Sequence, residues 1–115
     1  MGSINFASEA DRSRLLNGPA GTRATGTSDG KSYTVVKTSD GGYVAVNSMC
    51  PHNRNVPLSW KHSLCNGNTI QCGVDHWIWS LKTGEGIDNY GRPLPAEKEI
   101  AVIEVRECDG NFSIP

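Results

Sequence analysis

A chain of 115 residues has the length of one domain, and we expect residues 1–115 to fold around a single core. Its 11 Lys and Arg residues are balanced by 12 Asp and Glu residues, so no excess of positive charge favours nucleic acid as a partner. The longest apolar stretch is far too short to cross a bilayer and the first residues lack the pattern of a signal peptide, so we expect a soluble, cytoplasmic protein with no membrane partner.

The N-terminal part of the chain predicts one short helix and one strand. The segment SEADRSRLLNG has Ser8 as a helix N-cap, Asp11 three residues later and Gly18 as a stop signal, although a turn fits it equally well. The Gly- and Thr-rich residues 18–30 suit an edge strand between two turns.

The rest of the chain predicts β-structure. KSYTVVKT and YVAVNSM flank the turn sequence SDGG, so a hairpin is predicted over residues 31–49. Further strands are expected at residues 69–72, 76–81, 100–105 and 112–115, the last pairing back across the turn at 108–111. Short strands between regular turns predict an all-β fold, a small antiparallel β barrel or sandwich. Two loops interrupt the strands, at residues 50–68 and 73–76.

Each of these loops carries a Cys and His pair of candidate metal ligands, Cys50 with His52 and Cys72 with His76. Without an export signal, the four cysteines of the chain favour metal binding over disulfides. Two such pairs suit a cluster of two chemically different irons, in which thiolates hold one iron and imidazoles the other. Zinc ribbons use C-x2-C pairs and classical zinc fingers keep each kind of ligand together, so the mixed order argues against both.

With these ligands, the sequence resembles the Rieske [2Fe-2S] proteins and, among them, the small Rieske-type ferredoxins, whose pattern is C-x-H followed later by C-x-x-H. The resemblance begins near residue 31, reaches the end of the chain, and includes in order CPHNRNVPLS, GNTIQC, WIWSLKTGE and GRPLP. It implies a Rieske-like antiparallel β barrel or sandwich with a two-loop cluster-binding subdomain, its loops at about residues 50–58 and 72–77.

The second ligand pair departs from the family pattern. Aligned without gaps, CGVDHW places Gly73 at the family's proline, Asp75 at its histidine and His76 at its glycine. In the first of three outcomes, which we favour, Gly73 lets the loop bulge so that His76 reaches the iron. In the second, Asp75 ligates through a carboxylate oxygen. In the third, the cluster is lost or replaced by a single iron or zinc, as in Rieske-like subunits of some nitrite reductases.

The resemblance implies a Rieske-type [2Fe-2S] cluster bound by Cys50, His52, Cys72 and His76, with Asp75 as the alternative fourth ligand. It further implies a one-electron carrier, not itself an enzyme, that passes electrons from a flavin-dependent reductase to a terminal oxygenase of the aromatic-ring dioxygenase type. The alternatives are a Rieske-fold subunit of a nitrite-reductase-like enzyme and a cluster-free or zinc-stabilised binding module.

The remaining cysteines and aromatic residues have structural interpretations. Cys65 and Cys108 lie outside the motif and are expected to be small buried side chains. Trp77 and Trp79 are two residues apart, so on a regular strand they share one face, where they shield the core or the cluster. An apolar collar around the loops, suited to a transient partner, is expected from Val56, Pro57, Pro93 and Leu94.

Overall fold

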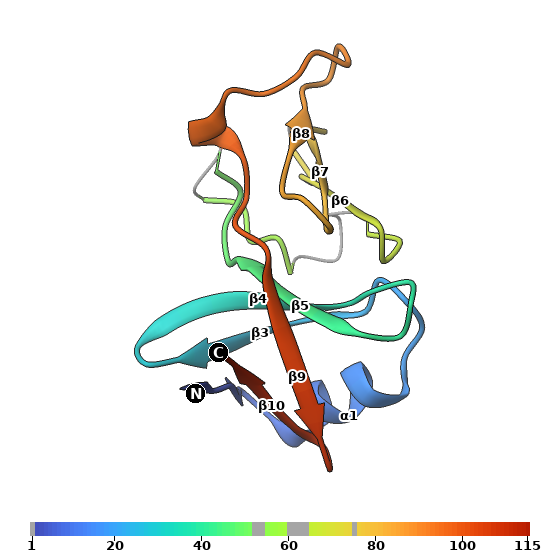
Figure 1. Ribbon diagram of the computed structural model, residues 1–115, viewed down its shortest axis with the longest axis vertical. Coiled ribbons are helices and arrows are strands. Elements are labelled where there is room, and N and C mark those ends of the chain that lie inside the picture. Colours follow the sequence, from blue (N-terminus) through green and yellow to red (C-terminus); the bar gives the residue numbers. More distant parts are fainter. Residues whose placement is uncertain (1, 52–54, 60–64, 75) are drawn as a thin grey trace.

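Two antiparallel β-sheets follow one another along the long axis of the molecule (Figure 1). The computed structural model describes residues 2–51, 55–59, 65–74 and 76–115. The larger sheet contains β1 (Gly2–Ser3), β2 (Asn5–Phe6), β3 (Arg23–Ser28), β4 (Lys31–Lys37), β5 (Tyr43–Asn47), β9 (Ile103–Cys108) and β10 (Asn111–Ile114). The smaller sheet contains β6 (Thr69–Gln71), β7 (Ile78–Ser80) and β8 (Gly86–Ile87). The 3-10 helix η1 (Ala96–Lys98) lies beside the smaller sheet.

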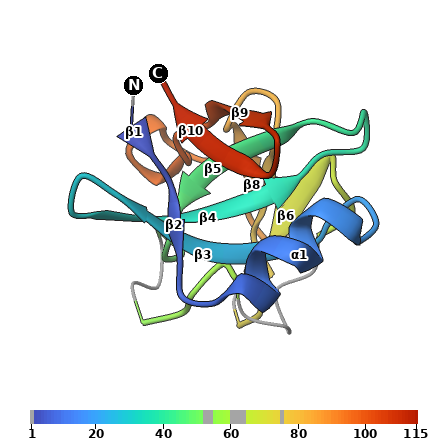
Figure 2. The same ribbon diagram turned by 90° about the horizontal axis from the view of Figure 1, so that it is seen from below.

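The larger sheet curls until its two edges approach each other. Its strand order is β1-β10-β9-β5-β4-β3-β2, which puts β1 and β2 at opposite edges. Only Ile4 separates these two strands in the sequence, so the edges cannot lie far apart and the sheet is nearly a closed barrel. Figure 2 views this end of the molecule and shows the two termini side by side, where β1 pairs with β10.

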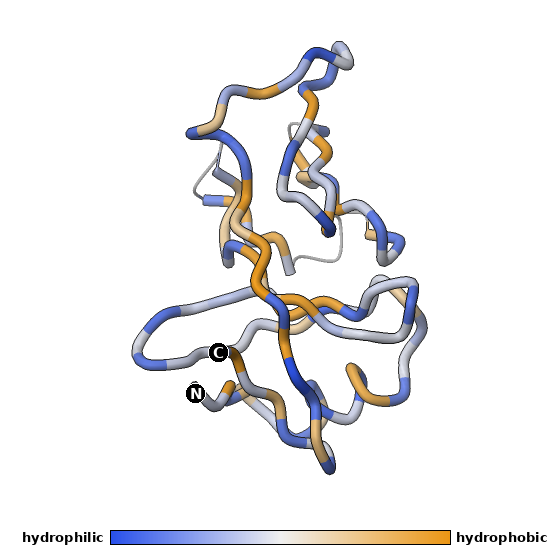
Figure 3. Tube along the Cα trace, viewed as in Figure 1, coloured by the Kyte–Doolittle hydropathy of each residue, from blue (hydrophilic) through white to orange (hydrophobic). Residues whose placement is uncertain are grey.

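The central strands β4 and β5 are buried on both faces because they separate two apolar cores. Val35 and Val36 of β4 are both fully buried, although successive side chains of a strand point to opposite faces. The barrel core contains Ile4, Leu15, Ala24, Val35, Tyr43, Ala45, Val105 and Phe112. The junction core contains Val36, Val46, Cys50, Val56, Leu58, Ile70, Cys72, Trp79, Leu81 and Ile100. In Figure 3, hydrophobic segments meet where the two sheets adjoin, so the junction core joins the barrel to the smaller sheet.

The N-terminal segment forms a helix, α1 (Glu9–Asn17), as predicted. The hydroxyl oxygen of Ser8 accepts a hydrogen bond from the backbone N–H of Asp11 at 3.3 Å, and Gly18 ends the helix by donating its N–H to the carbonyl of Arg14 at 2.8 Å. Leu15 is fully buried in the barrel core. Leu16 is half-buried and packs against the same core, so two adjacent leucines anchor a helix that is otherwise mostly polar.

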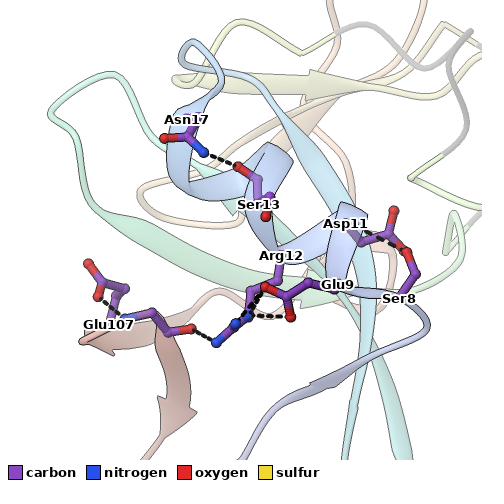
Figure 4. A network of polar contacts seen from close by, with 8 residues as sticks. Ser8, Glu9, Asp11, Arg12, Ser13, Asn17 and Glu107 are labelled. Atoms are coloured by element: carbon purple, nitrogen blue, oxygen red, sulfur yellow. Dashed lines mark hydrogen bonds and ion pairs between the residues drawn. The ribbon is translucent and has the colours of Figure 1, made fainter.

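Arg12 connects α1 to the turn between β9 and β10 (Figure 4). Its guanidinium donates to the Gly110 carbonyl at 2.9 Å and to the Glu9 carboxylate at 2.6 Å. The Glu107 carboxylate in turn accepts the Gly110 N–H at 2.9 Å. The Arg12 and Glu9 side chains are partly exposed, so this network orients the helix more than it stabilises the fold.

Most of the predicted strands are confirmed, with shifted ends. The hairpin predicted at 31–49 is β4 and β5, and β9 and β10 pair across the predicted turn. The strand expected at 100–105 begins only at Ile103, because Ile100 instead donates its N–H to the Gly84 carbonyl at 3.1 Å. The strand predicted within 18–30 is β3, but its predicted edge position is wrong, since β2 pairs with the outer side of β3. No helix in the described ranges is long and apolar enough to span a membrane.

Candidate metal centre

The first loop leaves β5 and returns as a narrow hairpin. The Cys50 N–H donates to the Val56 carbonyl at 2.8 Å, and the Leu58 N–H donates to the Ser48 carbonyl at 2.9 Å. Val56 and Leu58 are buried in the junction core and anchor the returning arm. Cys50 therefore stands at the base of the loop, where the two arms are still hydrogen-bonded.

The second loop connects β6 to β7 and has the same construction. Gln71 pairs with Ile78 in the sheet, and the Cys72 N–H then donates to the Trp77 carbonyl at 2.8 Å. The His76 N–H donates back to the Cys72 carbonyl at 3.1 Å and closes a single helical turn within the loop. Cys72 thus occupies the position in the second loop that Cys50 occupies in the first.

Both cysteines at these bases are fully buried. Cys50 and Cys72 expose none of their surface and belong to the same apolar core, which also contains Trp79 and Leu58. Neither forms a disulfide bond. The fold therefore places two thiols from two different loops in one apolar core.

Of the residues predicted to ligate the second iron, the structure describes only His76. His52 and Asp75 lie outside the described residues. His76 is exposed, and its Nδ1 lies 3.4 Å from the side-chain nitrogen of Gln71, which also donates to the His76 carbonyl at 3.3 Å. Among the residues that the structure describes, no three His, Cys, Asp or Glu side chains gather closely enough to hold a metal ion.

The donor set nevertheless fits half of a [2Fe-2S] cluster. Two buried thiols are soft donors suited to iron, and the apolar wall around them limits the access of water. Cys50 and Cys72 would hold the iron of the sulfur side.

A third segment, between β8 and η1, completes this end of the molecule. The Asp88 carboxylate accepts hydrogen bonds from the backbone N–H groups of Tyr90 at 2.8 Å and Arg92 at 3.0 Å, and from the Arg92 side chain at 3.1 Å. These bonds hold the pKa of Asp88 below its usual range, and the backbone bond from Arg92 is the largest cause. The Arg92 guanidinium also lies 5.1 Å from the centre of the Tyr90 ring.

A groove of about 460 Å³ separates this turn from the second loop. We call it the outer groove, and it is lined by Val74, His76, Trp77, Asp88, Asn89, Tyr90 and Arg92. Tyr90 is 76% exposed and Val74 is 49% exposed. Sequence reasoning did not single out Asp88, Tyr90 or Arg92, although Asp88 and Gly91 are ordinary turn signals.

Two hydrogen bonds tether the barrel to the end of the first loop. The Arg23 guanidinium donates to the Leu58 carbonyl at 3.3 Å, and the hydroxyls of Thr25 and Ser59 lie 2.8 Å apart. Burial is the main cause of a lowered pKa at Arg23. β3 therefore carries polar side chains that hold the loop from the barrel side.

The residues expected to form an apolar collar have different environments. Val56 is only 6% exposed and belongs to the junction core, so the prediction that it lies in an exposed collar is wrong. Leu94 packs against the same core, and Pro93 is exposed. Trp79 is fully buried whereas Trp77 is half-buried, with their ring centres 6.4 Å apart.

The two cysteines outside the motif lie in different places. Cys65 is half-buried against the junction core, and burial raises the pKa of its thiol. Cys108 is exposed at the end of β9, so the expectation of a buried side chain is wrong there. Neither forms a disulfide bond.

Two hairpin loops with cysteines at their bases, one leaving the antiparallel barrel and the other connecting two strands of the smaller sheet, define a class of small β-proteins that hold a metal cluster between loops. The chain belongs to the Rieske [2Fe-2S] domain family, whose model matches residues 9–104. The cofactor of this family is a [2Fe-2S] cluster. No curated protein matches the sequence.

Two solved structures share the fold. The ferredoxin of carbazole 1,9a-dioxygenase from Nocardioides aromaticivorans IC177 gives a TM-score of 0.69 at 14% identity, covering 99% of this chain and 97% of that chain. The Sphingomonas yanoikuyae B1 ferredoxin gives a TM-score of 0.64 at 19% identity, covering 83% of this chain and 85% of that one. These similarities confirm the predicted all-β, Rieske-type fold.

Proposed function

We propose that this protein carries one electron at a time on a [2Fe-2S] cluster held between its two loops. The observation that carries the proposal is the pair of buried thiols, Cys50 and Cys72, which two equivalent loops supply to one apolar core in a chain of the Rieske family. When bound, such a cluster accepts one electron from a donor and releases it to an acceptor.

In this proposal the two irons have different ligands. Cys50 and Cys72 hold one iron, and His52 holds the other together with either His76 or Asp75. The protein surrounds the sulfur side with apolar side chains, and burial and hydrogen bonds at the ligands set the potential. The chain supplies ligands, orientation and protection from water.

The partners we propose are a flavin-dependent reductase as electron donor and a terminal oxygenase of the aromatic-ring dioxygenase type as acceptor, all in the cytoplasm. The shared fold with the ferredoxin of carbazole 1,9a-dioxygenase supports this role. Two exposed side chains at the outer groove, Val74 of the second loop and Tyr90 of the third segment, provide surface for a small transient interface. As a carrier, the protein transforms no substrate itself.

The first experiment measures iron and zinc content and the low-temperature EPR spectrum of dithionite-reduced protein expressed with sufficient iron. We expect about two irons per chain and a reduced-cluster signal typical of mixed sulfur and nitrogen ligation. His52→Ala is expected to abolish that signal, because it removes an imidazole ligand.

Folded protein that contains no iron would overturn the proposal. Such a result would favour the cluster-free binding module or the nitrite-reductase-like subunit. One zinc per chain in a colourless protein would instead indicate a zinc-stabilised module.

A further inference from the structure

A second groove, of about 490 Å³, lies on the outer face of the barrel. We call it the barrel groove, and it is lined by residues of β2, β3, α1 and the end of the first loop. Figure 2 shows α1 beside β3, with which it is in contact. Along β3, the side chains of Arg23, Thr25 and Thr27 alternate with three buried residues. Because successive side chains of a strand point to opposite faces, these three polar side chains stand in one row on the outer face.

The helix and the first loop bring further polar groups to the barrel groove. Asp11 and Arg14 lie three residues apart on one face of α1, and their side chains form an ion pair at 3.0 Å. From the end of the first loop, the Ser59 hydroxyl lies 2.8 Å from that of Thr25. Two guanidinium groups and three hydroxyl groups therefore line one groove.

The barrel groove carries more positive than negative charge. Arg14 and Arg23 both line it, whereas Asp11 is the one carboxylate among its described lining residues. Burial is the main cause that lowers the pKa of Arg23, and the charge of Arg14 acts in the same direction. Cys65 acts in the opposite direction only when ionised, and burial raises the pKa of that thiol. An anion bound beside both guanidinium groups would be attracted by both.

We propose that the barrel groove binds a phosphate monoester of a small organic molecule, with its phosphate group held by Arg14 and Arg23. A phosphate has three acceptor oxygens and carries about −1.5 to −2 charges at pH 7, which suits two cations beside a row of hydroxyl donors. Guanidinium groups bind phosphate through paired hydrogen bonds. Neither Cys50 nor Cys72 lines the groove, so this proposal does not depend on the cluster.

The size and the remaining lining of the barrel groove suit the organic part of such a ligand. Sites for small organic molecules have volumes of about 300–1,000 Å³ and combine apolar surface with a few polar groups. Phe6 and Ala7 line the same groove and provide apolar surface. A bound ligand would also join α1 to the segment of β3 that holds the end of the first loop.

Isothermal titration calorimetry with phenyl phosphate is the direct test. The purified protein is titrated at neutral pH and constant ionic strength, and we expect saturable binding. Inorganic phosphate should bind more weakly because it lacks the ring, and acetate more weakly still because it has a single charge and two oxygens. Absence of saturable binding, or acetate binding as tight as that of phenyl phosphate, would overturn the proposal. Equal affinities for the two phosphates would overturn the organic part of the ligand.

Substitution of the arginines locates the ligand. Arg14→Gln is expected to weaken phenyl phosphate binding by about tenfold, the effect of one lost charge-assisted hydrogen bond. Arg23→Lys keeps the charge but loses the paired hydrogen bonds, so it should also weaken binding. Arg106→Gln is the matched control, because Arg106 is exposed on β9 and does not line the groove. Equal losses at Arg14 and Arg106 would overturn the proposal, and unchanged binding in Arg23→Lys would exclude Arg23.

Asp11→Asn tests the site with an effect of the opposite sign. This change removes the carboxylate that pairs with Arg14 and takes one negative charge away from the barrel groove. Phenyl phosphate should therefore bind several-fold more tightly. Circular dichroism checks that the variant remains folded. An affinity that stays the same or falls would overturn the placement of the phosphate beside Arg14.

Discussion

The indole nitrogen of Trp79 donates a hydrogen bond to the backbone carbonyl of Lys98 at 2.9 Å. Trp79 is fully buried in β7, and Lys98 ends η1, so the bond fastens the third segment to the sheet that carries the second loop. Gly86 reinforces the contact, since a Cβ there would lie 2.6 Å from Trp79 and 2.8 Å from Leu94. Close packing and one partly buried hydrogen bond therefore set the spacing between the third segment and the smaller sheet.

Trp79→Phe is expected to lower the free energy of unfolding by about 1–3 kcal/mol, because it removes a partly buried hydrogen bond to the Lys98 carbonyl and part of a fully buried side chain. Urea denaturation followed by circular dichroism measures the loss. Trp77→Phe is the matched control. It should lower the free energy of unfolding by less, because Trp77 is only half-buried. Equal losses in the two variants would show that the Trp79 hydrogen bond contributes nothing particular.

Gly84→Ala is expected to destabilise the protein by about 2–4 kcal/mol, because it combines a left-handed backbone with overpacking. Gly84 has a φ of 82°, and a Cβ there would lie 2.1 Å from the Ile100 carbonyl oxygen. Gly41 has a φ of 88° but no neighbour within 4 Å of a Cβ, so Gly41→Ala should cost only about 1 kcal/mol. Chemical denaturation of both variants separates the cost of the left-handed backbone, which both share, from the cost of overpacking, which only Gly84 has. Equal losses of stability would exclude an overpacking contribution at Gly84.

Cys50→Ser and Cys72→Ser are each expected to lose most of the bound iron, because each removes a thiolate of the proposed sulfur side. Cys65→Ser and Cys108→Ser should keep it, since these residues stand outside the two loop bases. Iron analysis of the four purified variants, with circular dichroism to check folding, gives the comparison. Retention of iron by the first pair would contradict the ligand assignment.

Asp88→Asn is expected to reduce the loss of stability in acid. The folded-state pKa of Asp88 lies below its unfolded value, which is about 3.9. The carboxylate therefore contributes stability that is complete above about pH 4 and is lost as the pH falls through the lower folded-state pKa. Tm measured from pH 7 down to pH 3 should fall less steeply in the variant, and parallel curves would show that these hydrogen bonds do not favour the ionised form.

Local sequence patterns predicted most of the fold. Turn residues and β-rich runs located the β4–β5 hairpin and the β9–β10 hairpin, because both depend on residues close together in the chain. The edge position of β3 was predicted wrongly because its outer partner, β2, is a two-residue strand with no pattern of its own. Val56 was misplaced for a similar reason, since its burial depends on the return path of the first loop.

The sequence by itself determined which residues have the chemistry of this protein: the C-x-H pair, the second cysteine, and the Asp75–His76 pair that departs from the family pattern. Only the tertiary structure decided that Cys50 and Cys72 share one apolar core and that His76 faces the outer groove. The physical reason is that ligand identity is a property of single residues. Burial and side-chain direction depend on contacts between distant segments, such as the pairing of Tyr43 with Val105, which local patterns do not contain.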